Sequence, residues 1–293
     1  MTLSKTAVAF TLIAALTLSF RADKPAYYLF DSEGRNVKYN EMIEAISKAD
    51  VVFFGELHDN PIAHWLEYEV TSDLHGIAGE RLALGAEMFE ADNQLLLDEY
   101  LGSEYAADKF EAEAKLWKNY KTDYKPLVEF AKKNGLPFVA TNIPRRYASM
   151  VSRGGFEELD SLTTEAKGYI APLPVPYDPE LKCYKEMMSM HGMPGMGGRP
   201  NENFPKAQAI KDATMAHFIA VNLPEGKIFI HYNGSYHSDN YLGIIHYLKI
   251  LRPGIRVATI STVLQEDISK PDPENLGIAD YIVVIPVTMT RTY

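Results

Sequence analysis

Short apolar runs rich in β-branched residues recur along the chain, and helical patterns separate most of them. The apolar runs cover residues 51–55, 82–88, 137–141, 227–232, 256–261 and 281–286. They lack clean alternation of apolar and polar positions, which is typical of strands that helices cover on both faces. The helical patterns cover residues 61–75, 93–101, 124–134, 205–222 and 243–251. This order predicts an α/β fold with a mostly parallel sheet flanked by helices.

Residues 156–204 interrupt the strand–helix rhythm. The segment contains no convincing strand pattern, and it carries the stretches APLPVPYDP and CYKEMMSMHGMPGMGG. The sequence therefore predicts a smaller helical subdomain inserted into the α/β body.

The first 22 residues differ from the rest of the chain. The stretch MTLSK supplies one lysine, and TAVAFTLIAALTLSF follows without a charge. A short cationic start before a brief apolar run is typical of a secretory signal peptide, and the run is shorter than the ~20 residues that span a bilayer. We expect a signal peptide over 1–22, a mature domain over 23–293, and export to the periplasm or cell envelope. Because no cysteine directly follows the apolar run, the sequence does not support a lipid anchor.

The formal net charge of -10 argues against a nucleic-acid partner, since phosphates require a basic surface. Cys183 is the only cysteine, so an exported chain would have no internal disulfide.

Two Gly-x-x-His sequences close apolar runs about 180 residues apart. The first contains Glu56 and His58, and the second ends at His237. Glu87 lies near the end of a third run. Ligands bind at the carboxyl ends of parallel strands, so we expect these four residues to converge in one cleft.

Two kinds of chemistry fit this set. His58, Glu87 and His237 would suit a divalent metal site with an open position. Together with Glu56 they would also suit an acid–base hydrolase. A purely structural role for Glu87, as the partner of a loop or a cation, stays open.

His64 and Tyr68 are one helical turn apart, so they share a helix face. The spacing would place an imidazole beside a phenol, although a half-buried histidine and tyrosine are also common on amphipathic helices. On the predicted helix 205–222, Gln208 and Asp212 interrupt an apolar face that includes Met215.

Five stretches resemble, in order, the ChaN-like haem-binding lipoproteins: VVFFGELHDNPIAH, LALGAEMFEADNQLLLDEYL, LPFVATNIPRRYASMVSRGG, FPKAQAIKDATMAHFI and GSYHSDNYLGI. The resemblance covers residues 50–251. The wider superfamily includes the Tiki/TraB proteins and the erythromycin esterases. The resemblance implies an α/β domain with a small helical one, and a role in haem-iron acquisition with outer-membrane uptake machinery as a partner. It also implies haem held by a tyrosine, with an assisting histidine, in a pocket that can form between two subunits of a homodimer.

The family's residues carry over in part. His58, Glu87 and His237 match polar motif positions shared with the hydrolytic relatives. Tyr68 is our first choice for the haem ligand and His64 for the assisting histidine. The family's lipid-modified cysteine is missing. Haem binding is therefore the first hypothesis, a hydrolase the second, and a binding module for another apolar ligand the third.

Overall fold

The computed structural model describes residues 23–104, 106–191, 201–223 and 225–293. The predicted signal peptide, residues 1–22, lies outside this part of the chain. The helices in the described part of the chain all fall short of the combined length and hydropathy that a membrane span requires.

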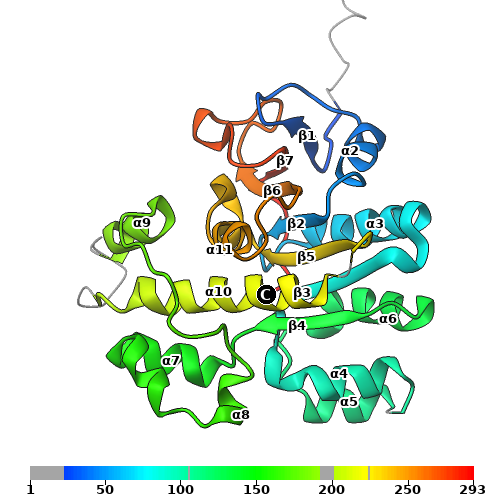
Figure 1. Ribbon diagram of the computed structural model, residues 1–293. Helices are drawn as coiled ribbons and strands as arrows, with labels where there is room; N and C mark the ends of the chain where they lie inside the picture. Colours follow the sequence, from blue (N-terminus) through cyan, green and yellow to red (C-terminus); the bar gives the residue numbers. More distant parts are fainter. Residues whose placement is uncertain (1–22, 105, 192–200, 224) are drawn as a thin grey trace, which may run out of the picture.

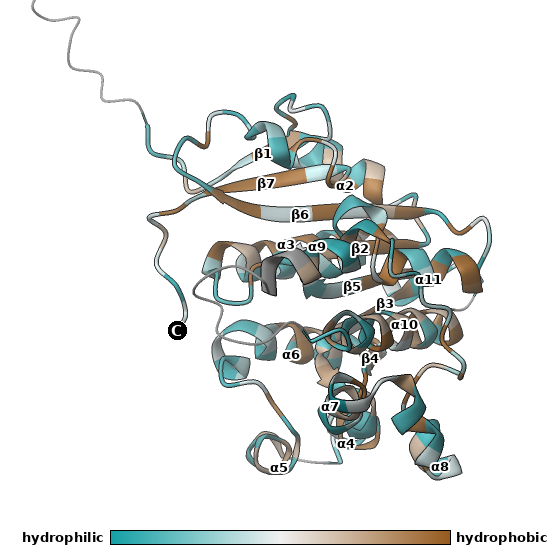
Figure 2. Ribbon diagram, turned by 90° about the vertical axis from the view of Figure 1, so that its left-hand side faces the viewer, coloured by the Kyte–Doolittle hydropathy of each residue, from teal (hydrophilic) through white to brown (hydrophobic). Residues whose placement is uncertain are grey.

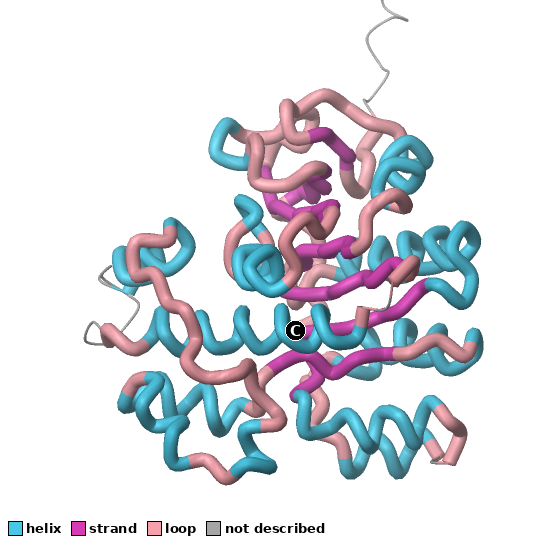
Figure 3. The backbone as a smooth tube through the Cα atoms, in the orientation of Figure 1, coloured by secondary structure: helices cyan, strands magenta, loops and turns pink. Residues whose placement is uncertain are grey.

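Seven strands form one sheet, drawn in magenta in Figure 3. Their order across the sheet is β1-β7-β6-β2-β5-β3-β4, and every neighbouring pair is parallel except β1 with β7. The strands are β1 (Tyr28–Asp31), β2 (Val51–Glu56), β3 (Leu82–Glu90), β4 (Phe138–Asn142), β5 (Ile228–Gly234), β6 (Val257–Gln265) and β7 (Tyr281–Pro286). The predicted mostly parallel α/β fold is confirmed. The sequence reading missed β1, a four-residue edge strand too short to show a period.

Helices cover both faces of the sheet (Figure 1). One face packs against α2 (Tyr39–Ile46), α3 (Pro61–Ala78), α4 (Gln94–Leu101), α5 (Ala107–Glu113) and α6 (Lys125–Asn134). The other packs against α7 (Arg145–Gly154), α9 (Lys182–His191), α10 (Phe204–Asn222) and α11 (Ile244–Leu251). We refer to these as the α3 side and the α10 side.

Strand β2 shows why its sequence is continuously apolar. Val52 and Phe54 belong to the core on the α3 side, whereas Val51 and Phe53 belong to the core on the α10 side. Successive strand residues point to opposite faces, and here both faces are covered. Figure 2 shows the resulting apolar strands inside a more polar shell of helices.

The predicted helical insertion contains helices and no strand in its described part. It includes a 3₁₀ segment at Phe156–Ser161, α8 (Thr164–Lys167) and α9. Leu159, Tyr184 and Met187 are buried in the core on the α10 side. The segment therefore packs onto the main body, and its status as a separate subdomain stays a prediction.

Candidate functional site

The two Gly-x-x-His turns lie side by side because β2 and β5 are neighbouring parallel strands. Gly55 is opposite Asn233, and Glu56 is opposite Gly234. A Cβ added to Gly55 would lie 2.9 Å from the Cα of Ser235. A Cβ added to Gly234 would lie 2.9 Å from Nε2 of His58. Each turn thus contains a glycine where the other turn occupies the space that a side chain would need.

A polar cluster on the α10 side surrounds the buried ring of His237. Its Nδ1 contacts Oδ1 of Asp212, and its Nε2 lies 3.3 Å from Oε1 of Glu87. The backbone N–H of Gly234 donates to Oε2 of Glu87 over 2.8 Å. The hydroxyl of Tyr184 donates to Oδ2 of Asp212 over 2.7 Å. These contacts hold two carboxylates against one imidazole.

A second cluster lies on the α3 side, around Glu56 at the end of β2. Its Oε1 is 2.6 Å from Nδ1 of His58 and accepts a hydrogen bond from the Tyr124 hydroxyl over 2.8 Å. Its Oε2 lies 2.5 Å from Nε2 of His64. The other nitrogen of His64 is 3.4 Å from Oδ2 of Asp123. Helix α3 begins at Pro61, where the Asn60 side chain accepts two backbone N–H groups, and this start sets the position of His64.

His58 lies between the two clusters. One ring nitrogen meets Glu56, while the other side of the ring lies against Gly234, whose N–H binds Glu87. The structure therefore brings His58, Glu87 and His237 to the same edge of the sheet, and Glu56 with them. Whether these residues catalyse a reaction or bind a metal stays a prediction.

His64 lies in the α3-side cluster, and its role as the residue that assists Tyr68 stays a prediction. His64 is buried, and both of its ring nitrogens face carboxylates. No hydrogen bond joins it to Tyr68 among the described residues. The Tyr68 ring instead packs edge-on against Phe130, with 5.6 Å between centroids.

Opposing effects set the protonation of the α10-side cluster. Burial opposes a charge on His237, but Glu87 and Asp212 outweigh it and raise the pKa of His237 to about 10. Burial also opposes ionisation of Glu87, but the charges of His237 and His58 hold the pKa of Glu87 below its usual range. We infer an ion pair at neutral pH.

The raised pKa of His237 predicts a pH-dependent stability. The pKa of His237 in the folded state is above the ~6.5 expected in the unfolded chain, so protonated His237 stabilises the fold. This stabilisation is complete below pH ~6.5 and is lost as the pH rises through the folded-state pKa. We expect the free energy of unfolding to fall between pH ~7 and ~10, with a slope approaching ~1.4 kcal/mol per pH unit. Chemical denaturation across this range measures the slope. The His237→Gln variant should not show this decrease in the free energy of unfolding. Identical slopes in the parent and the variant would contradict the ion pair.

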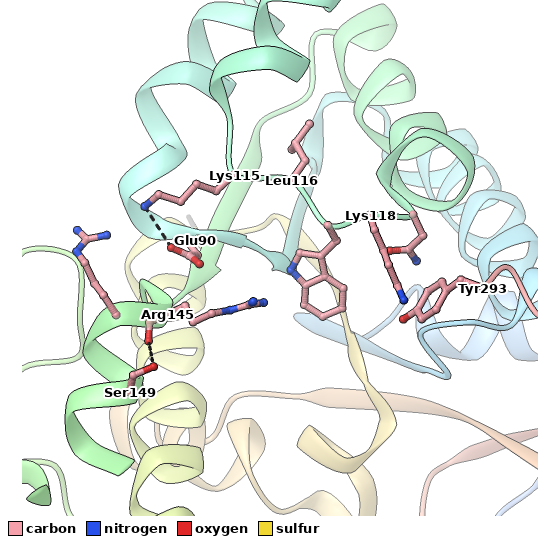
Figure 4. Close-up of a pocket in the computed structure, with 10 residues that line it drawn as sticks. Glu90, Lys115, Leu116, Lys118, Arg145, Ser149 and Tyr293 are labelled. Atoms are coloured by element: carbon pink, nitrogen blue, oxygen red, sulfur yellow. Dashed lines mark hydrogen bonds and ion pairs between the residues drawn. The ribbon is translucent and has the colours of Figure 1, made fainter. Parts of the chain in front are cut away.

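Figure 4 shows the lining of a cavity of about 800 Å³. Its wall includes Trp117, whose ring centroid lies 4.8 Å from that of His58. Arg145 reaches into it from one side, and Lys118 and Tyr293 lie on the other, with Nζ of Lys118 3.5 Å from the Tyr293 ring centroid. This cationic, aromatic lining suits an anionic ligand.

Sequence reasoning missed three residues of the α3-side cluster: Glu67, Asp123 and Tyr124. Glu67 is fully buried in α3, and Leu66 and Val70 on the same helix are buried as well. A carboxylate within the apolar stripe of α3 was the available signal, because burying such a group is costly unless it has a function or a partner.

A family model described as "Haem-binding uptake, Tiki superfamily, ChaN" matches residues 42–248. The chain belongs to the ChaN family. The match spans both Gly-x-x-His turns, so the site lies within the part of the chain that defines family membership.

Three solved structures align with most of this chain. ChaN of Campylobacter jejuni aligns with a TM-score of 0.67 and 18% identity, over 88% of this chain and 96% of its own. A Bacillus cereus protein aligns with a TM-score of 0.51 and 13% identity, over 97% of this chain and 98% of its own. A mutant of the erythromycin esterase EreC aligns with a TM-score of 0.47 and 12% identity, over 89% of this chain and 83% of its own. No curated protein matches the chain significantly.

Proposed function

We propose that this ChaN family member binds ferric haem on the outer face of α3, with Tyr68 as the iron ligand. Family membership supports haem as the ligand. The observation that supports the position is a cavity of about 490 Å³ beside α3 whose wall includes Trp65 and Tyr68.

The chemistry of the α3 face fits a porphyrin. Tyrosine is one of the side chains that hold haem iron in proteins, so Tyr68 would supply the iron-binding oxygen. Tyr68 is 37% exposed, so its oxygen can approach the iron, and Trp65 is 48% exposed beside it. Large exposed aromatic rings are expensive to leave in water and commonly mark binding sites. A haem plane would cover both rings.

The other exposed tyrosines provide a direct comparison. Among the described residues, Tyr28 and Tyr293 are the other tyrosines with comparable or greater exposure, at 37% and 51%. Tyr293 lines the cationic cavity next to Lys118. Tyr28 lies on the edge strand β1, where its ring packs against Phe30.

Tyr68→Phe removes the phenol oxygen and keeps the ring that packs against Phe130. We expect the variant to lose the tyrosinate-type absorption of the ferric complex and most of its haem affinity, with little change in thermal stability. Titration of the haem-free protein, followed at the Soret band, measures both properties.

Tyr28→Phe is the matched control, since it removes an equally exposed phenol elsewhere, and its spectrum should equal that of the parent. If Tyr293→Phe loses the absorption and Tyr68→Phe keeps it, the iron ligand lies in the cationic cavity and our assignment is wrong. A parent protein that binds no haem would refute the proposed function itself.

A second copy of the chain fits the same proposal. The structure of C. jejuni ChaN is described as cofacial haem binding. Two copies of this chain, each holding haem through Tyr68, would form a haem-dependent homodimer. Sedimentation before and after haem addition tests this, and an unchanged sedimentation coefficient would exclude it.

We also place the protein in the cell envelope, where it would exchange haem with outer-membrane uptake machinery. The apolar run near the start of the sequence and the uptake role in the family description support this location. Fractionation of cells that express the full chain is the test, and recovery in the cytoplasm alone would contradict it.

A further inference from the structure

A compact set of metal-type donors lies between β2 and α3. Glu56, His64 and Glu67 each offer a ligand atom, and these atoms all lie within 4.8 Å of one another. The three residues are buried, at 1%, 6% and 0% exposure.

The local sequence explains how the three donors meet. His64 and Glu67 are three residues apart on α3, so their side chains leave the same face of the helix. Glu56 ends β2 and reaches that face from the sheet, on the same side as Val52 and Phe54. Three donors thus come from two rigid elements, which is a favourable basis for a defined site.

Several donor atoms in this set lack a hydrogen-bond partner. Within the described residues, neither carboxylate oxygen of Glu67 has one, and neither does Oε2 of Glu56. The contact between Glu56 Oε2 and His64 Nε2 is short, but it does not have the geometry of an aligned hydrogen bond. Buried polar atoms are nearly always partnered, so an unpartnered group requires an explanation such as a bound ion.

The excess of buried carboxylates in this region also favours a bound cation. Asp123 lies next to His64, so three carboxylates surround one buried ring. Across the described chain, the ion pairs of Glu56 and Asp123 are all with histidines, and Glu67 makes none. Isolated buried carboxylates are costly unless a cation neutralises them.

We propose that Glu56, His64 and Glu67 bind a divalent transition-metal ion. One imidazole and two carboxylates are a donor set that suits a borderline cation such as zinc, at metal–ligand distances of ~2.0–2.2 Å. Small side-chain movements would bring the three atoms to such distances. Three protein ligands leave one position for water or another ligand.

The cavity beside α3 gives the ion a route. His64 and Asp123 both form part of its wall, together with Tyr68. The ion would therefore lie beneath the face that we propose for haem, although the metal site does not depend on haem binding. It is also distinct from the set of His58, Glu87 and His237 that the sequence suggested for a metal.

Zinc binding to haem-free, chelator-treated protein tests the proposal, by calorimetry and by metal analysis after desalting. We expect one zinc per chain and a higher melting temperature with zinc. Calcium should have no such effect, because it requires six to eight oxygen ligands. Glu67→Gln should weaken zinc binding at least ~100-fold, since loss of a direct ligand should exceed the effect of an outer-shell change.

Glu69→Gln is the matched control, because it removes one carboxylate from the same helix outside the donor set, and its zinc affinity should equal that of the parent. Without zinc, Glu67→Gln should melt at the parent temperature or above, which shows that the variant folds. If the parent binds no zinc, a proton shared between the carboxylates is the occupant and the proposal is overturned. Zinc affinity that survives Glu67→Gln but is lost in Glu87→Gln would also overturn it, by placing the ion on the α10 side.

Discussion

Asp212→Ala is expected to lower the free energy of unfolding by ~3–4 kcal/mol, because it removes one partner of a buried ion pair. Asp212 contacts the buried His237 ring, and the substitution leaves that ring with Glu87 as its charged partner. The Tyr184 hydroxyl also loses its acceptor. Urea denaturation of the parent and the variant measures the difference.

Two further variants separate the ion pair from simple loss of packing. Tyr184→Phe removes the other hydrogen bond to Asp212 and should cost only ~1–2 kcal/mol. The double variant Asp212→Ala/His237→Leu also removes the imidazole partner of the buried Glu87 carboxylate, so it should be less stable than Asp212→Ala alone. A double variant at least as stable as Asp212→Ala would show that the His237–Glu87 pair does not stabilise the fold.

Gly55→Ala is expected to lower the free energy of unfolding by ~2–3 kcal/mol through overpacking. The added Cβ would lie 2.9 Å from the Cα of Ser235 and 3.1 Å from the backbone oxygen of Ile260. Both are backbone atoms of neighbouring elements, so relief requires β2 to move relative to β5 and β6. Thermal and chemical denaturation measure the loss.

Gly76→Ala is the matched control for that change. Gly76 is in α3, where an added Cβ meets nothing within 4 Å, so alanine should stabilise the helix by ~0.5–1 kcal/mol. Gly234→Ala is a useful contrast, because its Cβ would meet the side chain of His58, which can move. It should cost less stability than Gly55→Ala but displace the His58 ring, which NMR of the imidazole can detect. Equal effects of Gly55→Ala and Gly76→Ala would show that the two turns do not interlock.

The fold was largely predictable because its signals are local. Each strand of the parallel sheet is an apolar run covered on both faces, and each of the long helices 61–75 and 205–222 has a proline in its first turn, which marks its start. The order of these patterns implies parallel strands whose carboxyl ends share an edge. Elements with weaker local signals were missed: β1 has four residues, and α7 begins with two arginines.

The residue types of the site were also visible in the sequence. Glycine followed by histidine at two strand ends, with Glu56 and Glu87 at strand ends, indicated a shared polar edge. The structure places these residues together. The sequence did not show why glycine recurs, because the reason lies in the other turn: Ser235 fills the space beside Gly55, and His58 fills the space beside Gly234.

Only the tertiary structure decided which polar residues join the cluster on the α3 side of the sheet and which join the cluster on the α10 side. Glu56 points to the α3 side, where it meets His64 and Glu67, whereas Glu87 meets His237 and Asp212 on the α10 side. The direction of a strand side chain depends on register, and its partners depend on which helix packs over that face. Spacing alone therefore paired His64 with Tyr68, one turn away on the helix. Packing instead turned His64 inward, where one ring nitrogen faces Glu56 at the end of β2 and the other faces Asp123, just before α6.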